Sequence, residues 1–145
     1  MDIIRVEQLV EKSKTIGLMG LDFILSFSAD AISKAYNGIG PQFLNERLRN
    51  KVTSFLGIFE PAALVHDLRF ELSDGTRKSF DYANCEFFVN CHKCAKAAYP
   101  WWNWKRYRAY AIIDAMYEFV CNDAGGWIAW RSAYHRNVAA SATPN

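Results

Sequence analysis

The sequence predicts a mostly α-helical protein with one domain, and three observations support this class. Apolar residues recur three and four positions apart over much of the chain, which is the spacing of amphipathic helices. Short segments rich in glycine and proline separate these stretches. A chain of 145 residues with 51% hydrophobic side chains is sufficient for one buried core. We assign residues 1–136 to the domain and predict a disordered tail over residues 137–145.

The first half of the chain is predicted to contain three helices. Apolar spacing predicts helices over residues 3–14 and 21–36, with Gly17 and Gly20 between them. The stretch YNGIGP, residues 36–41, is predicted to be a loop, since its two glycines and proline favour unusual backbone angles. The apolar pattern resumes over residues 42–56 as a third helix, which Gly57 ends.

Four more helices are predicted in the second half. One begins near Pro61, a residue favoured in the first helical turn, and runs to about residue 72. The turn LSDGTRKS follows, and its flanks LRFEL and RKSFDY alternate well enough to form a short β-hairpin. The next helix starts near residues 80–82 with Asp81 as its N-cap. Another spans residues 101–121 and stops at NDAGG, and the last ends near residue 136.

Charge and hydropathy argue against two classes of protein. The net charge is only +2, so the composition gives no strong nucleic-acid signal. The most apolar segment, residues 16–32, contains two aspartates, which argues against a transmembrane segment. The N-terminus is amphipathic and charged, unlike a signal peptide, so we expect a cytoplasmic protein or one delivered without a signal peptide. Basic residues cluster at Arg47, Arg49 and Lys51 and again at Lys105, Arg106 and Arg108.

The four cysteines are expected to be free thiols in a reducing compartment. Within CHKC, Cys91 and Cys94 have the spacing of a zinc or redox site. Zinc would need two more ligands. These could come from Cys85, Cys121, His92 or His135. Because the segment is predicted to be helical, we favour packed thiols over a zinc site.

His66 and Asp67 are adjacent inside the apolar stretch EPAALVHDLRF. Burying either group without a partner is costly. Neighbouring residues on a helix point about 100° apart, so the two side chains face different surroundings. Histidine titrates near neutral pH and can take a proton from water. The pair is therefore either a reactive site or a polar pair satisfied within the core.

The glycine loop, the HD helix and the following ANCEFF helix resemble, in this order, the phospholipase A2 superfamily. That family has a Y-x-G-x-G-type loop, a D-x-x-[AC]-x-x-HD-x-x-Y helix and a helix that often opens A-D-x-x-F. The resemblance covers residues 36–94. The matching positions are Tyr36, Gly38 and Gly40 in the loop, Glu60, Ala63, His66, Asp67 and Phe70 in the first helix, and Ala83, Asn84 and Phe87 in the second.

The resemblance implies a calcium-dependent acyl-ester hydrolase or a weakened relative of one. His66 would activate a water molecule. Hard oxygen ligands suit calcium, and the resemblance implies that these are a carboxylate oxygen of Asp67 and backbone carbonyls of Asn37, Gly38 and Gly40.

Three departures from the family pattern affect the expected activity. Asn84 replaces an aspartate, so it can hold the second imidazole nitrogen but brings no negative charge. Asp81, three residues earlier, is a candidate substitute. Phe70 lacks the hydroxyl of the family tyrosine, and the spacing from Gly40 to His66 is longer than usual.

The stretch PWWNWKRYRAY, residues 100–110, interleaves aromatic and basic side chains. Such a segment could stack on nucleobases or lie at a lipid interface. We favour a helix that packs into the core and carries a charged outer edge. The candidate ligand-contacting residues over the whole chain are Tyr36, Arg69, Phe70, Trp101, Trp104 and Arg106.

Two alternatives to a hydrolase remain open. One is a non-enzymatic phage or mobile-element accessory protein that binds a host protein or a nucleotide ligand. The other is a helical interaction protein in which the HD pair is incidental. A lipid or a small molecule would be the ligand of the hydrolase. A self-complementary aromatic surface would allow a homo-oligomer.

Overall fold

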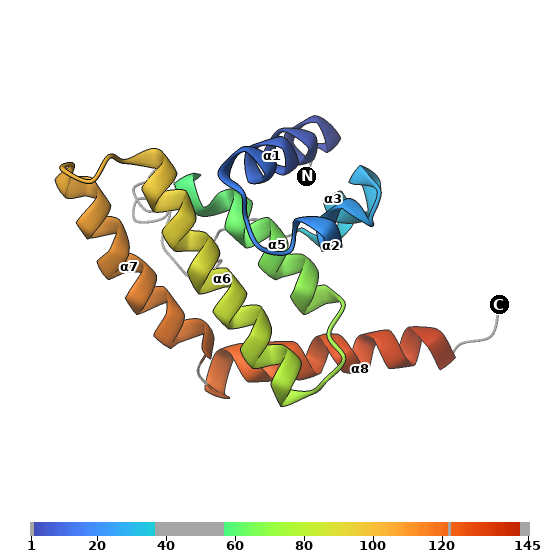
Figure 1. Ribbon diagram of the computed structural model, residues 1–145. Coiled ribbons are helices and arrows are strands. Elements are labelled where there is room, and N and C mark those ends of the chain that lie inside the picture. Colours follow the sequence, from blue (N-terminus) through green and yellow to red (C-terminus); the bar gives the residue numbers. More distant parts are fainter. Residues whose placement is uncertain (1, 37–56, 122, 143–145) are drawn as a thin grey trace.

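A computed structural model describes residues 2–36, 57–121 and 123–142, and these ranges are mostly helical and contain no strand, in agreement with the predicted class (Figure 1). Seven α-helices, one 3-10 turn and one π-helical turn follow one another in these ranges. They are α1 (Ile3–Ile16), α2 (Leu21–Leu25), α3 (Ala29–Ala35), η1 (Gly57–Phe59), α5 (Glu60–Glu71), α6 (Arg77–Ala98), α7 (Trp104–Cys121), η2 (Asp123–Trp127) and α8 (Ile128–Ala142).

The N-terminal helices confirm the predicted first helix and correct the second. Asp2 caps α1 by accepting a hydrogen bond from the Ile4 amide, and Gly17 ends the helix in the left-handed conformation. The single helix expected over residues 21–36 is instead two short helices. Ser28 interrupts it, because its hydroxyl accepts from the Ala31 amide and starts α3. The helix predicted over residues 42–56 lies outside the described residues.

Helices α5 and α6 form the antiparallel pair at the centre of the molecule (Figure 1). The predicted β-hairpin between them is wrong, since α5 continues to Glu71 and α6 already begins at Arg77. Thr76, and not Asp81, caps α6 by accepting from the Ser79 amide. The carboxylate of Asp74 accepts from the Thr76 amide and the Ser79 hydroxyl, which fixes the turn.

Helices α7 and α8 complete the bundle. The predicted sixth helix starts three residues late, because Asn103 closes a turn from Pro100 and its side chain accepts from the Lys105 amide. Helix α8 crosses the lower ends of α5 and α6 in Figure 1. It continues to Ala142, so residues 137–142 are helical where the sequence indicated a tail.

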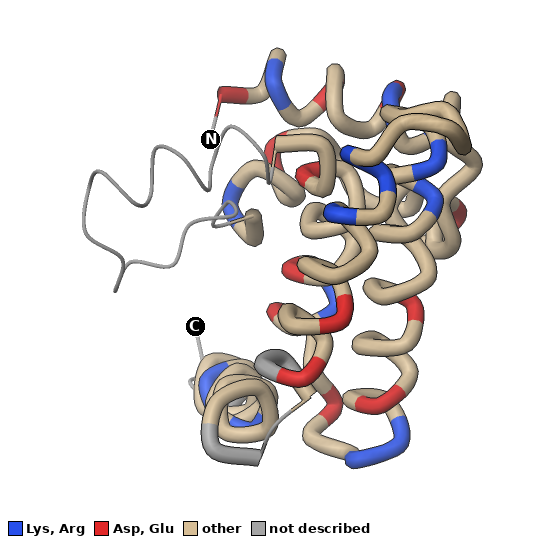
Figure 2. Tube along the Cα trace, turned by 90° about the vertical axis from the view of Figure 1, so that its left-hand side faces the viewer, with Lys and Arg blue, Asp and Glu red and all other residues tan. Residues whose placement is uncertain are grey.

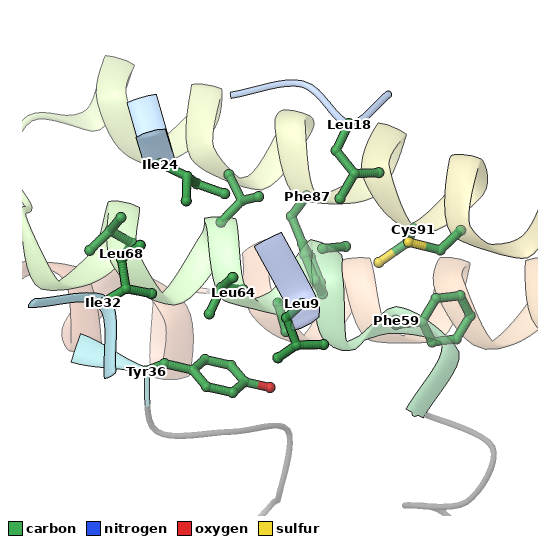
Figure 3. Packing of buried hydrophobic residues seen from close by; sticks show 14 of the residues in the cluster. Leu9, Leu18, Ile24, Ile32, Tyr36, Phe59, Leu64, Leu68, Phe87 and Cys91 are labelled. Carbon is green, nitrogen blue, oxygen red and sulfur yellow. The ribbon is translucent and has the colours of Figure 1, made fainter. Parts of the chain in front are cut away.

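The main core lies where α1, α3, α5 and α6 meet (Figure 3). Its fully buried side chains include Val6, Leu9, Ile24, Leu64 and Cys91. A smaller aromatic cluster joins α5, α6 and α8. No helix among the described residues is both long enough and apolar enough to cross a membrane. The burial of the apolar side chains in these two clusters is the main force that holds the helices together.

Candidate functional site

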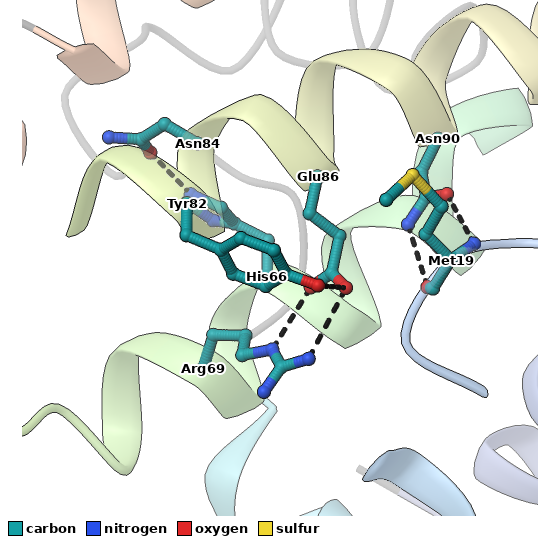
Figure 4. Close-up of polar contacts among 7 residues, drawn as sticks. All are labelled: Met19, His66, Arg69, Tyr82, Asn84, Glu86 and Asn90. Atoms are coloured by element: carbon teal, nitrogen blue, oxygen red, sulfur yellow. Dashed lines mark hydrogen bonds and ion pairs between the residues drawn. The ribbon is translucent and has the colours of Figure 1, made fainter. Parts of the chain in front are cut away.

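The imidazole of His66 on α5 contacts the amide of Asn84 on α6 (Figure 4). The distance from Nε2 of His66 to Oδ1 of Asn84 is 3.0 Å. An amide oxygen can only accept, so this orientation of Asn84 assigns a proton to Nε2, and in the neutral ring Nδ1 is then the basic nitrogen. The antiparallel packing of α5 and α6 produces this contact between residues 18 positions apart, as the motif order predicted.

Two phenylalanines pack against the ring of His66. Its centroid lies 4.3 Å from that of Phe70 and 4.5 Å from that of Phe87. The histidine is 8% exposed. Phe70, a candidate ligand residue, lies against His66 and contacts it through ring packing, since it has no hydroxyl to donate. The packing and the Asn84 bond together fix the orientation of the imidazole.

Asp67 lies on the same side of His66 as the free nitrogen. Its Oδ1 is 3.9 Å from Nδ1 of His66, and its side chain is 26% exposed. It lines a groove of about 280 Å³ between α5 and α8, together with Ala133 and Arg136. The predicted calcium partners at positions 37, 38 and 40 lie outside the described residues.

The predicted substitute Asp81 is directed elsewhere. It is exposed and pairs with Arg77, with 3.1 Å between Oδ1 and Nε. Asn84 is therefore the residue on α6 that orients His66. In the described part of the chain, the Nδ2 atom of Asn84 is buried and has no hydrogen-bond partner.

Arg69, a candidate ligand residue, forms a bidentate ion pair with Glu86 (Figure 4). Nε and Nη2 of Arg69 lie 3.0 and 3.2 Å from the two carboxylate oxygens. The guanidinium also stacks 3.7 Å above the ring of Phe23, and Tyr82 donates to Glu86 at 3.4 Å. This network links α2, α5 and α6 and fixes the helices that carry His66 and Asn84.

The other predicted ligand residues do not lie at the His66 site. Tyr36 is buried in the main core at the end of α3. Trp101 and Trp104 are 69% and 63% exposed at the α6–α7 turn, and Arg106 donates to the Tyr110 hydroxyl nearby. The helix of this segment packs on the main core through Ala109 and Tyr110 as expected, but its tryptophans are exposed and take no part in that packing.

The cysteines of CHKC are buried thiols that face the core. Cys91 and Cys94 are 0% and 1% exposed. Burial raises the pKa of Cys91 well above its ordinary value and raises the pKa of Cys94 to about 11. Among the described residues, no three His, Cys, Asp or Glu side chains come together as a metal site.

Sequence reasoning missed two buried polar residues on α6. Glu86 forms the ion pair with Arg69, and Asn90 exchanges two hydrogen bonds with the backbone of Met19 (Figure 4). Both share the face of α6 that buries Ala83, Phe87 and Cys94. A polar residue on an apolar helical stripe needs a partner, and this signal was available in the sequence.

Comparisons with models of protein families, with curated protein sequences and with solved structures gave no match for this chain.

Proposed function

We propose that this protein is a phospholipase A2-like acyl-ester hydrolase, or a weakened relative of one, in which His66 activates water. The observation that carries the proposal is the hydrogen bond between Nε2 of His66 and Oδ1 of Asn84. This bond leaves Nδ1 as the basic atom, and Asp67 is the nearest carboxylate to it along α5. General-base hydrolysis requires a base that is held in place, and the contacts of His66 hold its imidazole.

In the proposed reaction, Nδ1 of His66 takes a proton from water as the water oxygen attacks the ester carbonyl. The imidazolium then returns this proton to the departing alkoxide as the carbon–oxygen bond breaks. Asn84 keeps the ring in one tautomer throughout, and Phe70 and Phe87 keep it in place. Because Asn84 is neutral, it stabilises the imidazolium less than an aspartate would, so we expect slow turnover.

Calcium fits the donor chemistry of Asp67, whose partly exposed carboxylate lies 3.9 Å from the proposed base. When bound, a calcium ion polarises the ester carbonyl. Asp67 would hold it together with the backbone carbonyls of Asn37, Gly38 and Gly40, which lie outside the described residues.

The test is release of fatty acid from phospholipid micelles, measured with calcium and with a chelator. We expect calcium-dependent release that His66→Gln abolishes and Asn84→Asp raises, because a carboxylate stabilises the imidazolium. His135→Gln, which changes an exposed histidine on α8, is the matched control and should leave release unchanged. Equal release by the wild type and His66→Gln, or no release at any calcium concentration, would refute the proposal.

The neutral Asn84 also favours a second candidate, a non-enzymatic protein that keeps the same groove for binding. This candidate predicts that a ligand raises the melting temperature without being converted. The micelle assay separates the two candidates, since only the hydrolase releases fatty acid.

A further inference from the structure

The turn between α6 and α7 exposes a dense aromatic cluster. Trp101, Trp102, Trp104 and Tyr107 are 69%, 70%, 63% and 60% exposed. We call these four residues the aromatic turn. Isolated exposed apolar residues are ordinary, but a contiguous group of large aromatic side chains marks an interaction surface.

Hydrogen bonds within the aromatic turn hold its backbone. The Asn103 amide donates to the Pro100 carbonyl at 3.0 Å, and the Asn103 side chain caps the start of α7. The Tyr107 hydroxyl donates to the Trp101 carbonyl at 3.0 Å. The rings of Trp101 and Trp102 pack edge to face, with centroids 5.7 Å apart. Presenting these rings to a partner therefore costs little additional ordering.

Positive charge surrounds the aromatic turn. Residues 93–113 contain five Lys or Arg residues and no Asp or Glu. Lys105 and Arg108 are exposed beside the tryptophans. Figure 2, which views the molecule from the side of α7, shows basic segments around the end of the bundle that carries this turn. The charge therefore favours an anionic partner.

The composition and position of the aromatic turn favour a lipid surface as its partner. Its exposed aromatics are tryptophan and tyrosine, the residues that are enriched at membrane–water interfaces. The turn lies at an outer corner of the molecule (Figure 1), whereas single-stranded nucleic acids are usually bound along a groove. A second copy docked on the same face would bring the cations of both copies together.

We propose that the aromatic turn docks the protein on an anionic phospholipid bilayer. The indole rings enter the headgroup region, and Lys105 and Arg108 contact lipid phosphates. Asn84 lies 14 residues before the end of α6, so the turn is about 20 Å from the His66 site along the helix axis. This surface is thus separate from the proposed hydrolase site, and bilayer binding does not require hydrolysis.

The proposal is tested with the full-length protein and vesicles, by co-sedimentation and by the shift of tryptophan fluorescence. We expect binding to vesicles that contain phosphatidylglycerol, and much weaker binding to vesicles of phosphatidylcholine alone. Trp101→Ala/Trp102→Ala should lower the partition coefficient at least about tenfold. Lys105→Gln/Arg108→Gln should lower it by about 30-fold at low salt, since each cation contributes about fivefold.

Matched controls remove similar groups elsewhere. Ile3→Ala/Ile4→Ala shortens two exposed apolar side chains on α1, and Lys78→Gln/Arg131→Gln removes two exposed charges from α6 and α8. Both should bind like the wild type, apart from a small effect of net charge. Circular dichroism melting confirms that each variant is folded.

Three outcomes overturn the proposal. The first is no binding to anionic vesicles. The second is binding that the tryptophan variant retains in full. The third is binding of a single-stranded oligonucleotide, or formation of a dimer, that depends on Trp101 and Trp102 while vesicle binding is absent. In this third outcome the aromatic turn would be a binding surface for nucleic acid or for a second copy of the chain.

Discussion

Replacing Arg69 by leucine should destabilise the fold strongly, because it leaves the Glu86 carboxylate buried without its cation. The Glu86 side chain is 1% exposed and accepts two hydrogen bonds from the guanidinium. The Tyr82 hydroxyl lies 3.4 Å away, too far for a strong hydrogen bond. Breaking one side of a buried pair costs about 3–5 kcal/mol. For a domain of this size, the melting temperature should fall by about 10 °C.

Replacing Glu86 by leucine should lower the free energy of unfolding less than Arg69→Leu does, and this difference makes the test specific. In Glu86→Leu the remaining Arg69 side chain, 23% exposed, can turn towards water, so we expect a loss of about 1–3 kcal/mol. The double variant Arg69→Leu/Glu86→Leu removes both charges and should recover most of the loss caused by Arg69→Leu. Lys34→Leu breaks the exposed Lys34–Asp30 pair and should change stability by less than about 0.5 kcal/mol.

Urea unfolding followed by circular dichroism gives all four free energies. If the double variant loses the sum of the two single losses, the uncompensated carboxylate is not the cause, and the reasoning fails. A loss in Arg69→Leu no larger than that in Lys34→Leu would have the same consequence.

Three further predictions concern other parts of the fold. Gly20→Ala should lower the free energy of unfolding in urea clearly more than Gly17→Ala, although both glycines have positive φ. A Cβ at position 20 would lie 2.7 Å from an oxygen of the buried Glu86 carboxylate, whereas position 17 is open. Equal losses of stability in the two variants would contradict this prediction. Burial lowers the pKa of His92 below its ordinary 6.5. Its contribution to stability should therefore be complete above pH 6.5 and be lost as the pH falls below that value. His92→Gln should flatten the dependence of the free energy of unfolding on pH in this range. Iodoacetamide should modify exposed Cys85 in the native protein but Cys94, whose pKa is raised to about 11, only after unfolding, and mass spectrometry that finds both modified at equal rates would show that Cys94 is accessible.

Helices α1 and α5 were predicted correctly because local sequence signals fix where they begin or end. The spacing of apolar residues and the glycine after it located α1, and Pro61 located the start of α5. The proximity of His66 and Asn84 was predicted from the resemblance to the phospholipase A2 superfamily, and the antiparallel packing of α5 and α6 brings the two residues together.

Other features depend on competition between neighbouring signals. Ser28 could have been read as a polar residue within one long helix, but its hydroxyl caps α3 and divides the segment. The alternation in LRFEL suggested a strand, yet burial of Leu68 against the main core keeps the segment helical. Thr76 and Asp81 are both good caps, and the Asp74 turn selects Thr76.

Long-range contacts could not be read from the sequence. Nothing local shows that Glu86 meets Arg69, 17 residues earlier, or that Asn90 binds the backbone of Met19. The same limit applies to the aromatic turn. Helical spacing predicts which side chains share a face, but not whether another helix covers that face, and here none of the described helices buries Trp101, Trp102 or Trp104.

The central claim is that Asn84 holds His66 with its proton on Nε2, so that Nδ1 is the base. Nitrogen-15 NMR of the His66 ring in mildly alkaline solution tests this without requiring any activity. We predict a protonated Nε2 and a bare Nδ1, and we expect this preference to weaken in Asn84→Leu. A proton on Nδ1 in the wild type would contradict the claim, because the basic nitrogen would then face the amide of Asn84 and not the carboxylate of Asp67.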